Sequence, residues 1–230
     1  MKPSVVLFDA GGTLFTERLS RDEVYARELR SLGVALPLDE VARLRAAVHD
    51  ELPEVFAGCV RYSDGWFREF TRRLLARVGS AADPEPVRAR LAQHFLHAAS
   101  YVVHPDAPPA LAALRARGLR LAVVSNWSDR LPVLLDGLGL APSFETVVVS
   151  ALVGASKPDP AIFAEALRRL DAPAAAALHV GDHPRNDLAG ARAAGLAALL
   201  LDRAGAHAQD VAPEDRIRSL AELPGRMDPG

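Results

Sequence analysis

One carboxylate in this sequence stands where a buried strand is expected to end and a glycine turn to begin. Val5–Phe8 is a run of four large apolar residues, typical of a strand covered on both faces of a parallel sheet. Asp9 follows directly, at the strand end where such sheets bind ligands. Gly11 and Gly12 lack side chains, so their N–H groups should be open to an anion. Such a carboxylate can be a nucleophile, a metal ligand or both, although a plain strand and turn has the same pattern.

Three later segments supply further polar groups. Ser125 and Asn126 end an apolar run, and Lys157 precedes a Pro-Asp-Pro sequence that suits a helix start. Asp182 and Asp187 follow another apolar run within Gly-Asp-x-x-x-Asn-Asp. Each of these residues alone is ordinary, since a serine at a strand end or a lysine in a loop is usually structural. Their order along the chain is carboxylate, hydroxyl, ammonium and carboxylate pair.

This order resembles the haloacid dehalogenase superfamily, whose members hydrolyse substrates through an aspartate nucleophile and are mostly phosphatases. The resemblance covers nearly the whole chain, with spacings typical of members that carry an inserted helical cap. It implies that Asp9 is the nucleophile and that Lys157 is the ammonium that offsets the repulsion between two anions. It also implies a phosphate site. The Ser125 hydroxyl and the N–H of Asn126 would bind the phosphate, together with Gly12 and Lys157.

The resemblance further implies a magnesium site. Asp9, Asp182 and the backbone carbonyl of Gly11 would be direct ligands, because Mg²⁺ prefers oxygen ligands and keeps several waters. Asp187 would belong to the metal site through a water or by orienting the lysine. Its residue type also fits a helix N-cap, and the two roles are compatible.

Gly11 departs from the common family pattern. Most phosphatases of the superfamily carry a second aspartate here, which protonates the leaving group, whereas the 2-haloacid dehalogenases and a carbon–phosphorus bond hydrolase lack it. The pair Asp182 and Asp187 favours a phosphatase. The chain also resembles a branch without this second aspartate. Its first motif is an aspartate, two variable residues and Gly-Thr-Leu, and its second motif, Ser-Asn-aromatic, matches Ser125-Asn126-Trp127. His183 is a candidate substitute acid, and a loop residue is the alternative.

Three functions therefore remain open at this point. The first is a Mg²⁺-dependent phosphatase acting on a small phosphorylated metabolite. The second is a metal-independent, dehalogenase-like hydrolase that attacks carbon. The third is a catalytically impaired member that binds a phosphorylated ligand or a protein partner.

Composition sets outer bounds. The chain has 230 residues, half of them hydrophobic, and a formal net charge of −2, which fits a globular protein without nucleic-acid binding. The single cysteine, Cys59, excludes an internal disulfide, and we expect it to be a half-buried hydrophobe. No apolar run is long enough for a membrane span, so a cytoplasmic location is expected. The oligomeric state, monomer or homodimer, stays open.

The elements that position these residues fall into two groups. Residues 17–100 show helical periodicity without a strand-like run, which predicts an all-helical cap. Residues 1–16 and 101–230 alternate strands and helices, which predicts a parallel sheet with right-handed connections. The expected strands are 5–8, 119–125, 146–150, 177–180 and 197–201, and residues 216–223 predict one last short strand that runs into a helix. The predicted fold is α/β, a Rossmann-like parallel-sheet hydrolase core interrupted by the cap.

Overall fold

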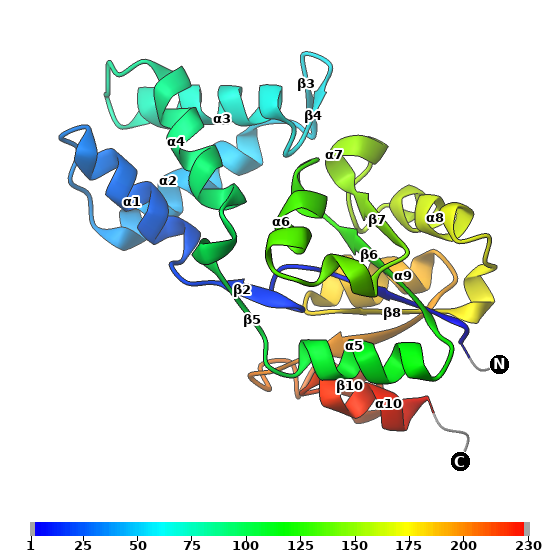
Figure 1. Ribbon diagram of the computed structural model, residues 1–230. Coiled ribbons are helices and arrows are strands. Elements are labelled where there is room, and N and C mark those ends of the chain that lie inside the picture. Colours follow the sequence, from blue (N-terminus) through cyan, green and yellow to red (C-terminus); the bar gives the residue numbers. More distant parts are fainter. Residues whose placement is uncertain (1–2, 228–230) are drawn as a thin grey trace. The chain divides into compact units, whose positions relative to one another are not determined.

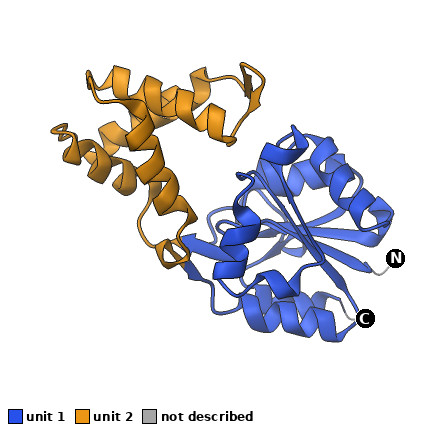
Figure 2. Ribbon diagram, turned by 45° about the horizontal axis from the view of Figure 1, so that its top comes forward, with its two compact units in different colours: residues 1–16, 102–230 blue, residues 17–101 orange. Residues whose placement is uncertain are grey.

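The structure is a computed structural model that describes residues 3–227 (Figure 1). The chain forms two compact units, coloured separately in Figure 2. Unit 1 comprises Met1–Thr16 and Val102–Gly230, and unit 2 comprises Glu17–Tyr101. No helix of the described residues is long and apolar enough to cross a membrane.

Unit 1 is built on a six-stranded sheet in the order β10-β9-β8-β1-β6-β7, in which neighbouring strands run parallel. The strands are β1 (Val5–Phe8), β6 (Arg120–Ser125), β7 (Thr146–Val149), β8 (Ala177–Gly181), β9 (Ala197–Leu201) and β10 (Arg216–Ile217). The α/β prediction is confirmed, because the five strands expected between residues 5 and 201 form with ends displaced by at most one residue, and the short strand expected within 216–223 forms as β10. Their continuous apolar runs mark them because both faces of the sheet are buried.

Helices cover both faces of this sheet. They are α5 (Ala107–Ala116), α6 (Leu131–Gly137), α7 (Ser150–Val153), α8 (Pro160–Arg169), α9 (Gly190–Ala193) and α10 (Leu223–Arg226). Single-turn 3₁₀ helices lie at Ala98–Ser100, Ala141–Ser143, Ala174–Ala176, Pro213–Asp215 and Leu220–Glu222. Val5 and Leu7 share one buried cluster with Phe163 of α8, so Val6 and Phe8 point to the opposite face.

The order of the strands creates a switch point at β1. From β1 the chain builds β6 and β7 on one side and then returns to place β8 on the other. Ligands bind at such points, beyond the carboxyl ends of the strands. Phe8 is paired with Val123 of β6 on one side and with Val180 of β8 on the other, so Asp9 emerges within one residue of the ends of both neighbouring strands.

Unit 2 has its own hydrophobic core, formed by four helices. They are α1 (Arg21–Ser31), α2 (Leu38–Glu51), α3 (Asp64–Arg77) and α4 (Pro84–Leu96). Ser20 and Glu23 form a capping box that starts α1, and Asp83 caps α4 through the N–H of Glu85. Cys59 packs half-buried against this core, as expected.

The expectation of a strand-free insertion is wrong at one place. A hairpin of two-residue strands, β3 (Val55–Phe56) and β4 (Cys59–Val60), lies between α2 and α3. Its turn residues Ala57 and Gly58 both have positive φ, 49° and 77°, as a tight hairpin turn requires. Two residues are too few for an alternating pattern, which is why periodicity missed them. The segments that join the units also pair, as β2 (Phe15–Glu17) and β5 (Tyr101–Val103).

Candidate active site

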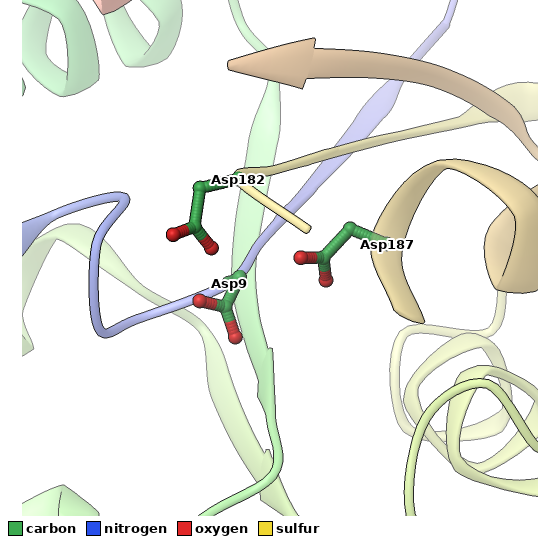
Figure 3. Close-up of side chains that lie close together, drawn as sticks. All are labelled: Asp9, Asp182 and Asp187. Carbon is green, nitrogen blue, oxygen red and sulfur yellow. The ribbon is translucent and has the colours of Figure 1, made fainter. Parts of the chain in front are cut away.

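Three carboxylates converge at the switch point of the sheet, and Figure 3 shows their side chains turned toward one another. Asp9 follows β1, Asp182 follows β8, and Asp187 lies in the next turn of chain. One oxygen from each lies within 4.8 Å of the others. The sequence separates these residues by up to 178 positions, and the parallel sheet brings them together.

A buried ammonium links two of the carboxylates. The Nζ atom of Lys157 donates to Asp9 Oδ1 and to Asp187 Oδ1, each at 2.6 Å. Only 4% of this lysine is exposed. Asn126 holds the loop that carries it, because the amide side chain donates to the Lys157 carbonyl at 2.9 Å and accepts from its N–H at 2.7 Å. Here Asn126 fixes the lysine with its side chain, a contact that the sequence did not reveal.

Ser125 completes the surroundings of Asp9. Its hydroxyl, at the end of β6, donates to Asp9 Oδ1 at 3.0 Å. Lys157 uses the same oxygen, so among the described residues neither donor engages Asp9 Oδ2. The carboxylate is thereby held by one oxygen and leaves the other for a substrate or a cation.

Asp187 is fully engaged by the protein. Its Oδ1 interacts with Lys157 and with the Nε2 atom of His179 at 2.9 Å, and its Oδ2 accepts the N–H of His183 at 3.0 Å. Asp187 lies within the π-helical turn Pro184–Ala189, whose N-cap is His183, so the prediction that Asp187 is a helix N-cap is wrong. A Cβ at Gly181 would come within 2.2 Å of Asp187 Cγ, so only glycine leaves room for this carboxylate.

The carboxylates perturb one another electrostatically. Burial raises the pKa of Asp9, and Lys157 opposes that rise. Burial works against ionisation of Asp187 as well, but Lys157 and His179 hold its pKa below the ordinary value. Partial burial and the charges of Asp9 and Asp187 raise the pKa of Asp182 to about 7, although part of that side chain reaches solvent. Burial lowers the pKa of Lys157, and the two carboxylates more than compensate, so the pKa is raised.

This charge balance suits a divalent cation. Three carboxylates face one ammonium among the described residues, which leaves the cluster about two negative charges in excess when all are ionised. The donors are oxygens only, the ligand type that hard cations such as Mg²⁺ prefer. Gly12 makes the arrangement possible, because a Cβ there would lie 2.1 Å from Asp182 Oδ2, and its φ of +78° also favours glycine.

Comparison with known proteins gives the family. A model of the haloacid dehalogenase-like hydrolase family matches residues 3–195. The chain belongs to this family. A protein of Danio rerio, haloacid dehalogenase-like hydrolase domain-containing protein 3, is 33% identical over 231 residues, covering 96% of this chain and 95% of its own length. The glyceraldehyde 3-phosphate phosphatase of Methanopyrus kandleri is 35% identical over 86% of this chain and 83% of its own.

A solved structure gives the same family. The crystal structure of a 2-haloacid dehalogenase from Pseudomonas syringae pv. Tomato DC3000 is 30% identical and superposes with a TM-score of 0.72 over 97% of both chains. The resemblance inferred from the four motifs is therefore confirmed at the level of family and fold. The chain is a hydrolase of the haloacid dehalogenase family.

The turn after Asp9 explains why this hydrolase has glycine at position 11. A Cβ at Gly11 would lie 2.9 Å from the Trp127 ring, so the indole occupies the space that an acidic side chain would need. The indole also packs edge-on against Phe15, with ring centroids 5.8 Å apart. The next N–H in the turn, that of Gly12, donates to the Phe15 carbonyl at 2.8 Å. The expectation that this N–H is open to an anion is therefore wrong, and Gly12 contributes space instead.

The hydrogen bonds of His183 disfavour it as a substitute acid in the hydrolase. Its Nδ1 atom accepts the N–H groups of Arg185 and Asn186, each at 3.2 Å, and so caps the turn that carries Asp187. An accepting Nδ1 requires the neutral ring with its proton on Nε2. The acidic imidazolium would lose both capping bonds.

One buried partner of the site escaped the sequence reasoning. His179 is fully buried in the middle of β8 and contacts Asp187. A polar residue inside an otherwise apolar strand run was the available signal, because a buried imidazole needs a hydrogen-bond partner.

Proposed function

We propose that this hydrolase is a Mg²⁺-dependent phosphatase that acts on a small phosphorylated metabolite through nucleophilic attack by Asp9. The observation that carries the proposal is the Asp9 carboxylate, held through one oxygen by Lys157 and Ser125 with a second carboxylate beside it. The relative from Methanopyrus kandleri is named as a phosphatase of a small sugar phosphate, and this supports the substrate class. A cytoplasmic location is part of the proposal and rests on the shortness of the apolar runs in the sequence.

Each residue has a distinct task in this mechanism. Asp9 Oδ2 attacks phosphorus, the bond from phosphorus to the leaving oxygen breaks, and the leaving group departs with its electron pair. When substrate binds, the Ser125 hydroxyl would turn from Asp9 Oδ1 to a phosphoryl oxygen. The Lys157 ammonium donates two of its three protons to Asp9 and Asp187, so its third can bind the phosphoryl group, and its charge offsets the repulsion between that group and the nucleophile. Water then attacks phosphorus in the aspartyl phosphate, which releases phosphate and restores the carboxylate.

The cation site would consist of Asp9, Asp182 and the carbonyl oxygen of Gly11. When bound, Mg²⁺ supplies positive charge that stabilises the phosphoryl oxygens in the transition state. Asp187 contributes by fixing Lys157, because both of its oxygens already accept hydrogen bonds from the protein. The site would thus combine one ammonium and one divalent cation around a single nucleophile.

A second candidate is a dehalogenase-like hydrolase that attacks carbon without a metal. The absence of an acid at Gly11 favours it, since a halide leaves unprotonated, and a 2-haloacid dehalogenase is among the similar structures. The excess negative charge contributed by Asp182 argues against it, because a metal-free site gains nothing from a third carboxylate.

One assay separates these candidates. Aryl phosphate, sugar phosphate and 2-haloacid substrates are incubated with parent protein in Mg²⁺ and in EDTA. We expect phosphate release in Mg²⁺ only. Asp9→Asn should abolish it, while Asp136→Asn, which changes an exposed carboxylate on α6, should retain it. Halide release in EDTA would support the dehalogenase instead, and no turnover with retained phosphate binding would indicate an impaired member.

A further inference from the structure

We propose that His179 is a positioning residue, whose imidazole N–H holds the Asp187 carboxylate in the orientation that presents Lys157 to Asp9. This inference rests on the proposed function for its kinetic consequence, and on geometry for the arrangement itself. The residues form one line of contacts from the interior of the sheet to the nucleophile: His179 to Asp187, Asp187 to Lys157, and Lys157 to Asp9.

The location of His179 is unusual for a polar side chain. It lies in β8, paired with Leu7 of β1 on one side and with Ala198 of β9 on the other, and none of it is exposed. Its ring stands edge-on to Phe163, with centroids 5.1 Å apart, among the apolar residues of that face. Packing alone would accept an aliphatic side chain here, and burying a polar group costs free energy unless it forms a hydrogen bond. The bond to Asp187 is therefore what distinguishes histidine at this position.

The surroundings fix which ring nitrogen carries the proton. Nε2 lies 2.9 Å from Asp187 Oδ1, whereas Nδ1 is buried and has no hydrogen-bond partner among the described residues. A carboxylate oxygen only accepts, so the proton of the neutral ring lies on Nε2 and is donated to Asp187. A neutral donor orients the carboxylate without cancelling its charge. Asp187 therefore keeps the full charge that binds the ammonium of Lys157.

Two geometric features make this bond consequential. Asp187 Oδ1 accepts from His179 and Lys157 together, so loss of the imidazole frees that oxygen to follow the lysine. The Lys157 ammonium donates to both carboxylates at 2.6 Å, so a small rotation of Asp187 would change the distance and direction of the hydrogen bond from Lys157 to Asp9. In metal sites, removing the partner that orients a ligand typically costs about 10–100-fold in metal affinity or activity, and we expect a loss of similar size here.

The test compares three variants. His179→Leu removes the donor and keeps an apolar side chain, and His179→Gln keeps an N–H donor on a flexible side chain. Phe163→Leu is the packing control, because it loosens the same contact and leaves the hydrogen bond intact. With an aryl phosphate, we expect kcat to fall about 10–100-fold in His179→Leu with little change in KM, and to recover largely in His179→Gln. Phe163→Leu should lower the unfolding temperature and keep kcat.

The positioning role of His179 can also be tested without measuring phosphatase activity, so its failure can be distinguished from failure of the proposed function. Lys2 and Lys157 are the only lysines in the sequence, so ¹⁵N-lysine labelling isolates the Lys157 ammonium in an NMR spectrum. We expect slow proton exchange of that ammonium in the parent, in Phe163→Leu and in His179→Gln, and fast exchange in His179→Leu. Unchanged exchange in a folded His179→Leu would overturn the positioning role, even in a protein that hydrolyses no phosphate. If His179→Leu does not fold, failure of His179→Gln to keep slow exchange would overturn it equally.

Discussion

When no cation is bound, the Asp182 carboxylate should lower the free energy of unfolding. Asp182→Asn tests this directly, because the amide carries no charge. Its pKa rises from 3.8 to about 7 in the folded protein because of partial burial and the charges of Asp9 and Asp187. Below about pH 4 the group is protonated in both states and costs nothing. Between about pH 4 and 7 the unfolded state loses its proton first, so stability falls as pH rises, and the cost is constant above about pH 7.

The size of the effect follows from the same shift. At about 1.4 kcal/mol per pKa unit, the full shift would correspond to roughly 4 kcal/mol. Part of the Asp182 side chain reaches solvent, and screening reduces that figure, so we expect about 1–2 kcal/mol. For a protein of this size such a change raises the unfolding temperature of Asp182→Asn by about 2–8 °C relative to the parent.

The assay is urea or thermal unfolding of parent and Asp182→Asn in EDTA, near pH 3.5 and near pH 8. Asp182→Asn should be more stable than the parent near pH 8, with most of that advantage gone near pH 3.5, whereas Asp136→Asn should match the parent at both pH values. Mg²⁺ should stabilise the parent and have little effect on Asp182→Asn, because a ligand stabilises only the state that binds it. Equal stability of parent and Asp182→Asn near pH 8 would show that the Asp182 charge does not destabilise the folded protein.

Three further predictions concern the nucleophile, the leaving group and the lysine loop. Asp9→Asn should fold like the parent, by circular dichroism, but fail to form a beryllium fluoride complex, since an amide is a poor nucleophile and a poor ligand; complex formation would move the nucleophile elsewhere. Without a leaving-group acid, kcat/KM should favour aryl over alkyl phosphates by about 10²–10⁴-fold. Gly11→Asp alone should leave the ratio of aryl to alkyl kcat/KM unchanged, because its Cβ would lie 2.9 Å from the Trp127 ring. The double variant Gly11→Asp, Trp127→Ala should lower that ratio. Equal kcat/KM for aryl and alkyl phosphates in the parent would show that another group donates the proton. Asn126→Ala removes both hydrogen bonds to the Lys157 backbone, so it should lower the free energy of unfolding in urea by about 2 kcal/mol and also lower kcat. An unaltered kcat would show that other contacts hold the loop.

The sheet was predictable from sequence because its strands are buried on both faces. Runs such as Val5–Phe8 are uniformly apolar, and the polar residue after each run marks the strand end, which fixes where Asp9 emerges. The π-helical turn Pro184–Ala189 was not predicted, because its first residues lack apolar periodicity and Asp187 suggested a helix that starts after it. The hairpin of β3 and β4 was missed because its strands are too short for a pattern.

The candidate site was predictable in its residues but not in its contacts. Motif order brings out Asp9, Lys157 and Asp182, because residues at the ends of neighbouring parallel strands meet at one edge. Which partner each group chooses depends on distances of a few tenths of an ångström across elements far apart in sequence. The role of His179 and the clash between position 11 and the Trp127 ring belong to this second kind of information.

The nucleophilic role of Asp9 is tested by looking for phosphate on this residue during turnover. Parent protein is mixed with an aryl phosphate and Mg²⁺, quenched in acid, which preserves aspartyl phosphates, and its peptides are analysed by mass spectrometry. We predict a phosphorylated peptide that contains Asp9, formed in Mg²⁺, lost in EDTA and absent from Asp9→Asn. Phosphate release without any phosphorylated Asp9 peptide, or the same modification in EDTA, would contradict the account.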